Sequence, residues 1–205
     1  NLQPGKLDRR ATLISGGPRP LGMMGGIDAS FDAAIFIGYH ARASTTDATL
    51  DHTYTGQLKR VWFNDRELGE AGLNAAVAGQ FGVPVVFVSG DRTVTEEVAA
   101  LVPAVEGVVV KEAIGRTAAH LLHPKESIER IAAGVTVGLG RRSRTQPLIF
   151  ESPVTLRIEV ADSGQADQVM LVPGMKRVGP RLVEYVAIDA VAAYRVSRLV
   201  RLLAE

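Results

Sequence analysis

The sequence predicts an α/β fold, in which a mostly parallel sheet with flanking helices is followed by a smaller α+β lobe. Continuous apolar runs at 33–39 and 83–89 are typical of strands covered on both faces, as in parallel sheets. Segments with helical spacing separate these strands. From residue 154 polar and apolar residues alternate, as they do in half-exposed strands. We therefore expect an α/β core at 1–144 and an α+β lobe at 145–205.

The core begins with a Gly- and Pro-rich segment, 1–26, whose short apolar run at 11–14 predicts one strand in a connecting stretch. Asp91 or Thr93 suits the N-cap of a helix. Pro124 suits a first helical turn, where its missing N–H removes no hydrogen bond. The remaining core strands are expected at 33–39, 58–64, 83–89 and 107–111, and the core helices at 67–80, 91–101 and 124–139.

The lobe follows a basic loop in which Arg141, Arg142 and Arg144 lie among Gly, Ser and Thr. Without aromatic residues between the arginines, we interpret the loop as a solvated segment and not as a nucleic-acid surface. The expected strands of the lobe are 154–160 and 182–188, with helices at 165–171 and 189–203.

Net charge, length and the absence of cysteine limit which kinds of partner and metal site the protein can have. The chain has 205 residues and a net charge of +1, so no large electrostatic field favours nucleic acid or an anionic membrane. A chain of this length buries a core without staples, so a bound metal would serve chemistry and not folding. There are no cysteines. Any transition metal must therefore be held by His, Asp or Glu, and the composition fits a cytoplasmic location.

Two histidines lie at the ends of a polar loop of small residues. His40 directly follows the strand at 33–39, and ligands bind at the carboxyl ends of strands in open α/β sheets. A histidine there can equally be satisfied by a backbone carbonyl. His52 comes twelve residues later. It suits a mobile loop that brings an acid or base over a site, and a solvated loop histidine is the alternative.

Glu70 is the last charged residue before the twenty uncharged residues 71–90. On a helix it shares a face with Leu73, Asn74 and Val77, so we expect that face to be buried. A buried carboxylate is costly unless it is paired. Metal ligation, a salt bridge or the helix dipole would each satisfy it, and the residues alone favour the salt bridge.

Three other features complete the list of candidates. The helix after Glu70 is built mainly from Ala and Gly, which predicts tight packing, with close approach to a ligand as the alternative. His120 and His123 are spaced i, i+3 next to Pro124. They fit a helix end better than a metal site. Lys111 and Arg116 could bind a substrate carboxylate, but two isolated cations define no site.

Three segments together resemble the DppA-type D-aminopeptidases, a family of zinc metallopeptidases. They are GYHARAST at 38–45, a histidine in the following loop (His52), and FNDRELGEAGLNAAVAGQFGVPV at 63–85. The resemblance continues through VVVKEAIGRTA at 108–118 and SGQADQVMLVPG at 163–174, so it covers essentially the whole chain.

The resemblance implies a site with two zinc ions held by carboxylates and histidines. His40 matches a metal-binding histidine, Glu70 matches a metal-binding glutamate, and His52 matches the histidine with a direct catalytic role. It also implies a preference for D-residues and a ring-like homo-oligomer that encloses the active sites.

The chain departs from the family pattern at its start. Members begin with a strand that carries S-x-D-x-E-G, followed by a further histidine, and neither occurs here. Because a catalytic zinc takes about three protein ligands, we expect an upstream polypeptide segment to supply the rest. Proteolytic processing before Asn1 would explain the start without Met, and a signal peptide stays open.

We therefore expect a zinc-dependent aminopeptidase that hydrolyses short peptides with a free N-terminus, as a processed subunit. One alternative is a catalytically inactive binding or scaffold protein of the same fold. Another is a metal-dependent hydrolase of a different small amide. A scaffold needs none of His40, His52 and Glu70, so their joint presence favours the enzyme.

Overall fold

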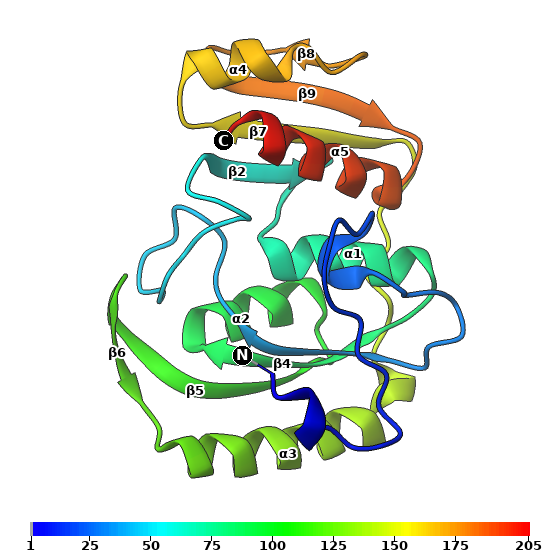
Figure 1. Cartoon of the computed structure of the whole chain (residues 1–205), viewed down its shortest axis with the longest axis vertical. Coiled ribbons are helices and arrows are strands. Elements are labelled where there is room, and N and C mark those ends of the chain that lie inside the picture. The colour runs from blue at the N-terminus through cyan, green and yellow to red at the C-terminus, as the bar shows by residue number, and fades with distance from the viewer. Residues whose placement is uncertain (1) are drawn as a thin grey trace.

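Two β-sheets of different character organise the chain, whose residues 2–205 are described by a computed structural model (Figure 1). The first sheet has the order β1-β4-β5-β6. Its members are β1 (Ala34–Tyr39), β4 (Val85–Asp91), β5 (Glu106–Gly115) and β6 (Ala118–Leu121). The first three run parallel and β6 is antiparallel to β5.

The second sheet is antiparallel throughout and has the order β3-β2-β7-β9-β8. Its members are β2 (Leu58–Phe63), β3 (Arg66–Glu67), β7 (Val154–Val160), β8 (Lys176–Arg177) and β9 (Leu182–Ala187). The predicted α/β class is confirmed, although the sheet structure is only partly parallel. The division at residue 144 stays a prediction, but the second sheet crosses it, because β2 comes from the first part of the chain.

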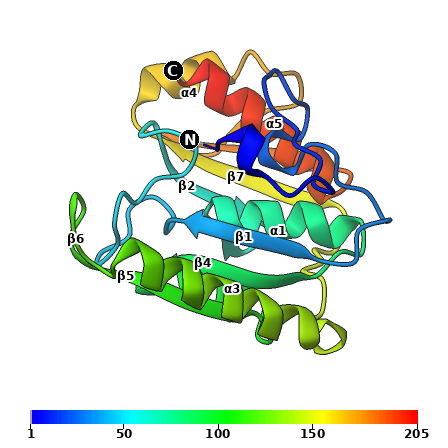
Figure 2. The same cartoon turned by 60° about the horizontal axis from the view of Figure 1, so that its bottom comes forward.

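Helices pack on both faces of the first sheet and between the sheets (Figure 2). They are α1 (Glu70–Gln80), α2 (Arg92–Leu101), α3 (Pro124–Gly140), α4 (Ser163–Val169) and α5 (Ala190–Leu203), with 3-10 turns at Pro4–Lys6, Gly22–Met24 and Arg142–Arg144. The neighbouring β5 residues Gly107 and Val108 lie against α2 and α3 respectively. Since successive strand residues face opposite sides, α2 and α3 cover opposite faces.

Helix α1 lies between the first sheet and α5 and is buried on every side (Figure 1). The predicted face of Leu73, Asn74 and Val77 is buried, and Asn74 Nδ2 donates a hydrogen bond to Tyr39 Oη at 2.9 Å. At Gly79 a Cβ atom would overlap with the carbonyl oxygen of Leu148. The small residues of this helix therefore serve close packing, as predicted.

Three predicted helix starts are confirmed, whereas the helices expected from 67 and 165 begin at Glu70 and Ser163. Asp91 is the N-cap of α2, where its side chain accepts a hydrogen bond from Val94 N at 3.0 Å. Pro124 lies in the first turn of α3, and Asp189 caps α5. These local signals need only neighbouring residues, so they can be recognised in the sequence.

Several local predictions are wrong. Ile35 and Ile37 are exposed on one face of β1, so this strand is not covered on both faces, and within the described part of the chain it is an edge strand. The run at 11–14 forms no strand. His120 lies in β6, and His123 is the N-cap of α3, so they do not share a helix.

None of the helices in residues 2–205 combines the length and hydropathy needed to cross a membrane. The cytoplasmic location stays a prediction from composition.

Candidate metal centre

His40 takes its position from a bulge at the end of β1. The pairing of β1 with β4 shifts between Phe36 and Tyr39, and Gly38 between them has a φ of 73°. Glycine adopts this left-handed conformation without steric cost, and a bulge redirects the strand. Gly38 N donates to Ser89 Oγ of β4 at 3.2 Å, which holds the bulge in place. His40 therefore begins the loop at the carboxyl end of the sheet.

His52 returns to His40 because the loop between them is anchored at both ends. Thr49 N donates to Asp91 Oδ2 at 2.7 Å, and Asp91 is fully buried at the end of β4. His52 N donates to Ala41 O at 3.3 Å. The imidazole rings of His40 and His52 consequently stack with their centroids 3.7 Å apart.

Glu70 completes the cluster from the first turn of α1. Its Oε1 lies 3.2 Å from His40 Nε2 and 3.6 Å from His52 Nε2, and it accepts a hydrogen bond from Tyr54 N at 2.9 Å. The residue is only 7% exposed. One ligand atom from each of the three side chains lies within 4.8 Å of the others. The two histidines and the glutamate that the sequence singled out are thus brought together.

The imidazoles of His40 and His52 use their Nδ1 atoms for backbone hydrogen bonds, which leaves their Nε2 atoms available to a metal. His40 Nδ1 lies 3.1 Å from Ala41 O, and His52 Nδ1 lies 2.6 Å from Leu50 O. A carbonyl oxygen only accepts, so each Nδ1 carries a proton and each Nε2 faces Glu70. A protonated Nε2 donates to the carboxylate, and a deprotonated Nε2 offers its lone pair to a metal. Metal-binding histidines commonly donate their second N–H in this way. Two imidazole nitrogens and one carboxylate form a donor set that fits zinc.

The pKa shifts of His40 and Glu70 favour a positive charge next to an ionised Glu70 carboxylate. Burial lowers the pKa of His40, but hydrogen bonds to Glu70 and to the Ala41 carbonyl outweigh it, so the pKa lies above the ordinary value. Burial raises the pKa of Glu70, but hydrogen bonds from His40 and Tyr54 N outweigh it, and the pKa lies below its usual range. An ionised carboxylate facing a cation is therefore favoured, and a metal ion would meet the same need.

Tyr54 holds Glu70 in place through a backbone hydrogen bond, and the sequence analysis did not identify it. It adopts a φ of 62°, which is rare for a bulky residue and directs its N–H at the carboxylate. Its ring packs edge-on against Tyr194 of α5 at 6.3 Å, and its hydroxyl lies 3.5 Å from Ser197 Oγ. The contribution of Tyr54 is a backbone N–H, so its residue type gave no signal.

A cavity of about 190 Å³ lies beside His52, and Lys59 and Arg116 both contribute to its wall. Lys111, the other cation considered from the sequence, instead lines a separate cavity with His120. Of the two cations, therefore, only Arg116 reaches the candidate site.

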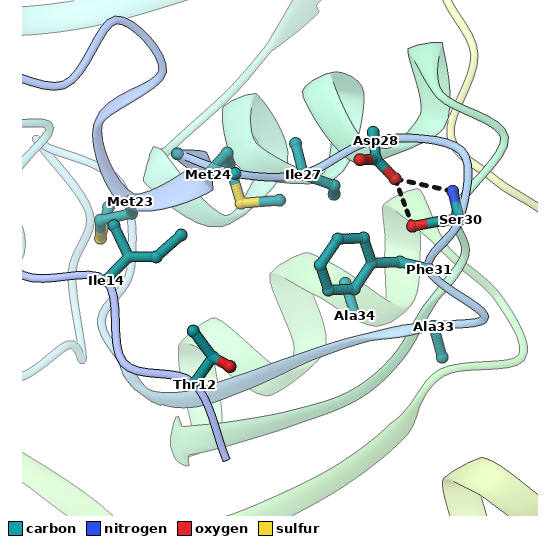
Figure 3. A pocket seen from close by; sticks show the side chains of 12 residues that line it. Thr12, Ile14, Met23, Met24, Ile27, Asp28, Ser30, Phe31, Ala33 and Ala34 are labelled. Atoms are coloured by element: carbon teal, nitrogen blue, oxygen red, sulfur yellow. Dashed lines mark hydrogen bonds between the residues drawn. The ribbon is translucent and has the colours of Figure 1, made fainter. Parts of the chain in front are cut away.

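A larger cavity, of about 800 Å³, lies elsewhere (Figure 3). It is lined mainly by apolar side chains of 12–34, including Ile14, Met24 and Phe31, and its one acid, Asp28, is hydrogen-bonded to Ser30. None of the three clustered side chains lines it. Its size alone therefore does not make it the site of chemistry.

Comparison with known proteins identifies relatives over the full length of the chain. A family model described as D-aminopeptidase (Peptidase_M55) matches residues 1–199. A D-aminopeptidase of Bacillus subtilis (strain 168) is 37% identical over 196 residues, which cover 95% of this chain and 71% of the relative. A structure described as the Zn-dependent D-aminopeptidase DppA from Bacillus subtilis, a self-compartmentalizing protease, superposes with a TM-score of 0.96 at 36% identity. The matched region covers 100% of this chain and 74% of the chain of that structure.

Proposed function

The chain belongs to the D-aminopeptidase family, and from this premise we propose that it hydrolyses short peptides with a free N-terminus, including D-peptides, with zinc. The observation that carries the proposal is the convergence of His40, His52 and Glu70 within 4.8 Å. The Bacillus subtilis relative of known structure is described as Zn-dependent. The donor set found here suits the same metal.

The three side chains have two different roles, metal binding and proton transfer. His40 Nε2 and Glu70 would hold the metal. A zinc ion bound there supplies Lewis acidity, which lowers the pKa of water and polarises a carbonyl group. His52 acts as the general base and acid: its Nδ1–H is fixed on Leu50 O, and its free Nε2 accepts a proton from water and passes it to the leaving amine.

The number of zinc ions sets a requirement for further ligands. Each catalytic zinc takes about three protein ligands. If His52 is reserved for proton transfer, His40 and Glu70 cannot fill two such sites. The expected two-ion site therefore requires additional protein ligands beyond this cluster, from the upstream polypeptide segment. Elemental analysis of the purified protein, as zinc per chain, tests this requirement.

The assembly of the protein belongs to the same proposal. The relative of known structure is described as self-compartmentalizing. We expect this chain to form a ring-like homo-oligomer in which the active sites face an enclosed space that only short or unfolded peptides reach. Sedimentation of the native protein measures the oligomer size, and a monomer at working concentration would contradict the proposal.

Hydrolysis assays on metal-free and zinc-restored protein test the activity. We expect cleavage of D-Ala-D-Ala that is lost with a chelator, recovered with zinc and absent from Glu70→Gln. L-Ala-L-Ala and a simple amide are assayed beside it. A zinc-loaded protein that cleaves only the amide would be a different hydrolase. One that cleaves none of the three would be a binding or scaffold protein.

A further inference from the structure

We propose that Lys59 binds the C-terminal carboxylate of a short peptide in the cavity beside His52, so that the site selects peptides whose carboxyl end is free. This inference rests on the proposed function and specifies its substrate class. It begins from the position of the cavity. His52 lines the cavity and stacks on His40, so the cavity opens directly next to the metal-binding cluster.

The size of the cavity suits the end of a small substrate. Its volume of about 190 Å³ lies below the range of about 300–1,000 Å³ that is typical of pockets for drug-sized ligands. Its polar wall comes from Ser44, Asp51, Lys59 and Arg116. A cavity of this size and polarity fits one terminal residue of a peptide better than a long chain.

Asp51 and Arg116 neutralise each other and fix the wall. Arg116 Nε lies 2.9 Å from Asp51 Oδ1, and Arg116 Nη2 donates to Asp51 O at 3.1 Å. The other carboxylate oxygen of Asp51 accepts from Ser44 N at 2.9 Å. Arg116 O also accepts from Leu50 N at 2.7 Å. This pair therefore attaches the β5–β6 turn to the loop and leaves no free charge of its own.

Lys59 is the remaining charge. Its Nζ donates to Gly56 O at 2.7 Å. Among residues 2–205 no carboxylate forms an ion pair with it. The nearby carboxylates pair with other side chains: Asp51 with Arg116, Glu67 with Arg42 and Arg60, Glu70 with His40 and His52, and Glu97 with Arg42. An ammonium group has three N–H donors, so two stay available.

The unneutralised charge fixes the direction of the substrate. Two cations and one carboxylate line the cavity and leave one positive charge, which attracts a carboxylate and repels an α-ammonium group. A peptide therefore lies with its carboxyl end against Lys59 and its amino end beyond the cluster. The bond next to the amino end then reaches His52 only when the peptide is short.

A pair of substrates that differ only in this charge tests the inference. The zinc-loaded protein is assayed with D-Ala-D-Ala and with its C-terminal amide. Because one charge-assisted hydrogen bond is at stake, we expect wild type to prefer the acid by about 10- to 100-fold in kcat/KM. In Lys59→Met the ratio of acid to amide falls toward one. Lys59→Arg retains the preference, and the exposed Lys176→Met serves as the matched control with the wild-type ratio.

Binding measurements separate this inference from the proposed function. Calorimetry of the metal-free protein, which the proposed function leaves without activity, gives the affinity for both peptides without turnover. Tighter binding of the acid, by about tenfold or more and dependent on Lys59, supports the carboxylate site even if neither peptide is hydrolysed. Equal binding and hydrolysis of acid and amide by wild type overturns the site and leaves the aminopeptidase standing. A Lys59→Met variant that weakens both peptides alike overturns it as well.

Discussion

At Glu70 one carboxylate oxygen meets the Nε2 atoms of His40 and His52 and the N–H of Tyr54. Because the side chain is buried, water cannot compensate its charge, and removing a partner would leave an expensive unpaired group. The histidine Nδ1 atoms are already committed to backbone carbonyls. The residue chemistry therefore favours a cation held by His40 and Glu70, with the His52 imidazole beside it.

The role of His52 can be separated from that of His40 by substitution. If His52 transfers protons, His52→Ala lowers kcat by about 10²- to 10⁴-fold and keeps its zinc. His40→Ala loses zinc and activity together. Steady-state kinetics with metal analysis of both variants measures the difference. Loss of zinc from His52→Ala equal to that from His40→Ala would make His52 a ligand.

Glu97 gives the cleanest dependence of stability on pH. Burial raises its pKa, although hydrogen bonds from Arg42 N at 3.0 Å and Arg42 Nη1 at 3.3 Å oppose the rise. The native state then holds this proton at higher pH than the unfolded chain. The contribution to stability is therefore present below the ordinary value of 4.5 and is lost as pH rises through the raised pKa.

Glu97→Gln removes that titration. We expect the free energy of unfolding of this variant, relative to that of wild type, to increase as pH rises from about 4 to 7. Urea unfolding at several pH values measures the difference. A constant difference across this range would show that the pKa of Glu97 is not raised in the native protein.

At the scale of elements, the loop from His40 to Gln57 is anchored by contacts with three other elements. The α2 N-cap Asp91 binds Thr49 N, the β5–β6 turn binds the loop through Arg116, and α1 supplies Glu70. Three elements far apart in the sequence thus hold one loop. Because the loop is anchored in this way, His52 keeps a defined distance from the Glu70 carboxylate of α1.

The packing of α1 has a direct test at Gly79. A methyl group there would overlap with Leu148 O, so Gly79→Ala should destabilise the protein by about 1–3 kcal/mol as the helix shifts. Gly140→Ala is the matched control, since nothing lies within 4 Å of an added Cβ at that helix end. Urea unfolding compares the two variants. Equal stabilities would mean that α1 is packed less closely than described.

At the scale of the whole molecule, the metal cluster lies between the carboxyl end of the first sheet and the start of α1. His40 comes from the end of the first sheet, whereas Tyr54, which holds Glu70, packs on Tyr194 and Ser197 of α5 above (Figure 1). Binding of zinc to this cluster therefore ties together elements from both halves of the fold.

Zinc should stabilise the whole fold and not only the site. A ligand that binds only the native state adds about 2.7 kcal/mol at a concentration 100 times its Kd and about 4.1 kcal/mol at 1,000 times. We expect a higher Tm with zinc than with a chelator, and no zinc-dependent shift in Glu70→Gln. Differential scanning calorimetry measures both. A zinc-dependent shift that persists in Glu70→Gln would place the metal elsewhere.

The sequence by itself determined the features that depend on neighbouring residues. The apolar run at 83–89 predicts a buried strand, and Asp91 and Pro124 mark helix starts through short-range hydrogen bonding. Twenty uncharged residues after Glu70 indicate its burial. The family motif then identified the residues of the cluster.

Only the tertiary structure decided what depends on distant partners. Within the described residues no element covers the face of β1 that carries Ile35 and Ile37, and β2 joins the second sheet because it pairs with β7, about 100 residues away in sequence. The contact of Arg116 with Asp51 and the N–H of Tyr54 under Glu70 likewise leave no local pattern. Periodicity reports which faces of an element are apolar, but strand order and loop anchoring are set by energies summed over the whole fold.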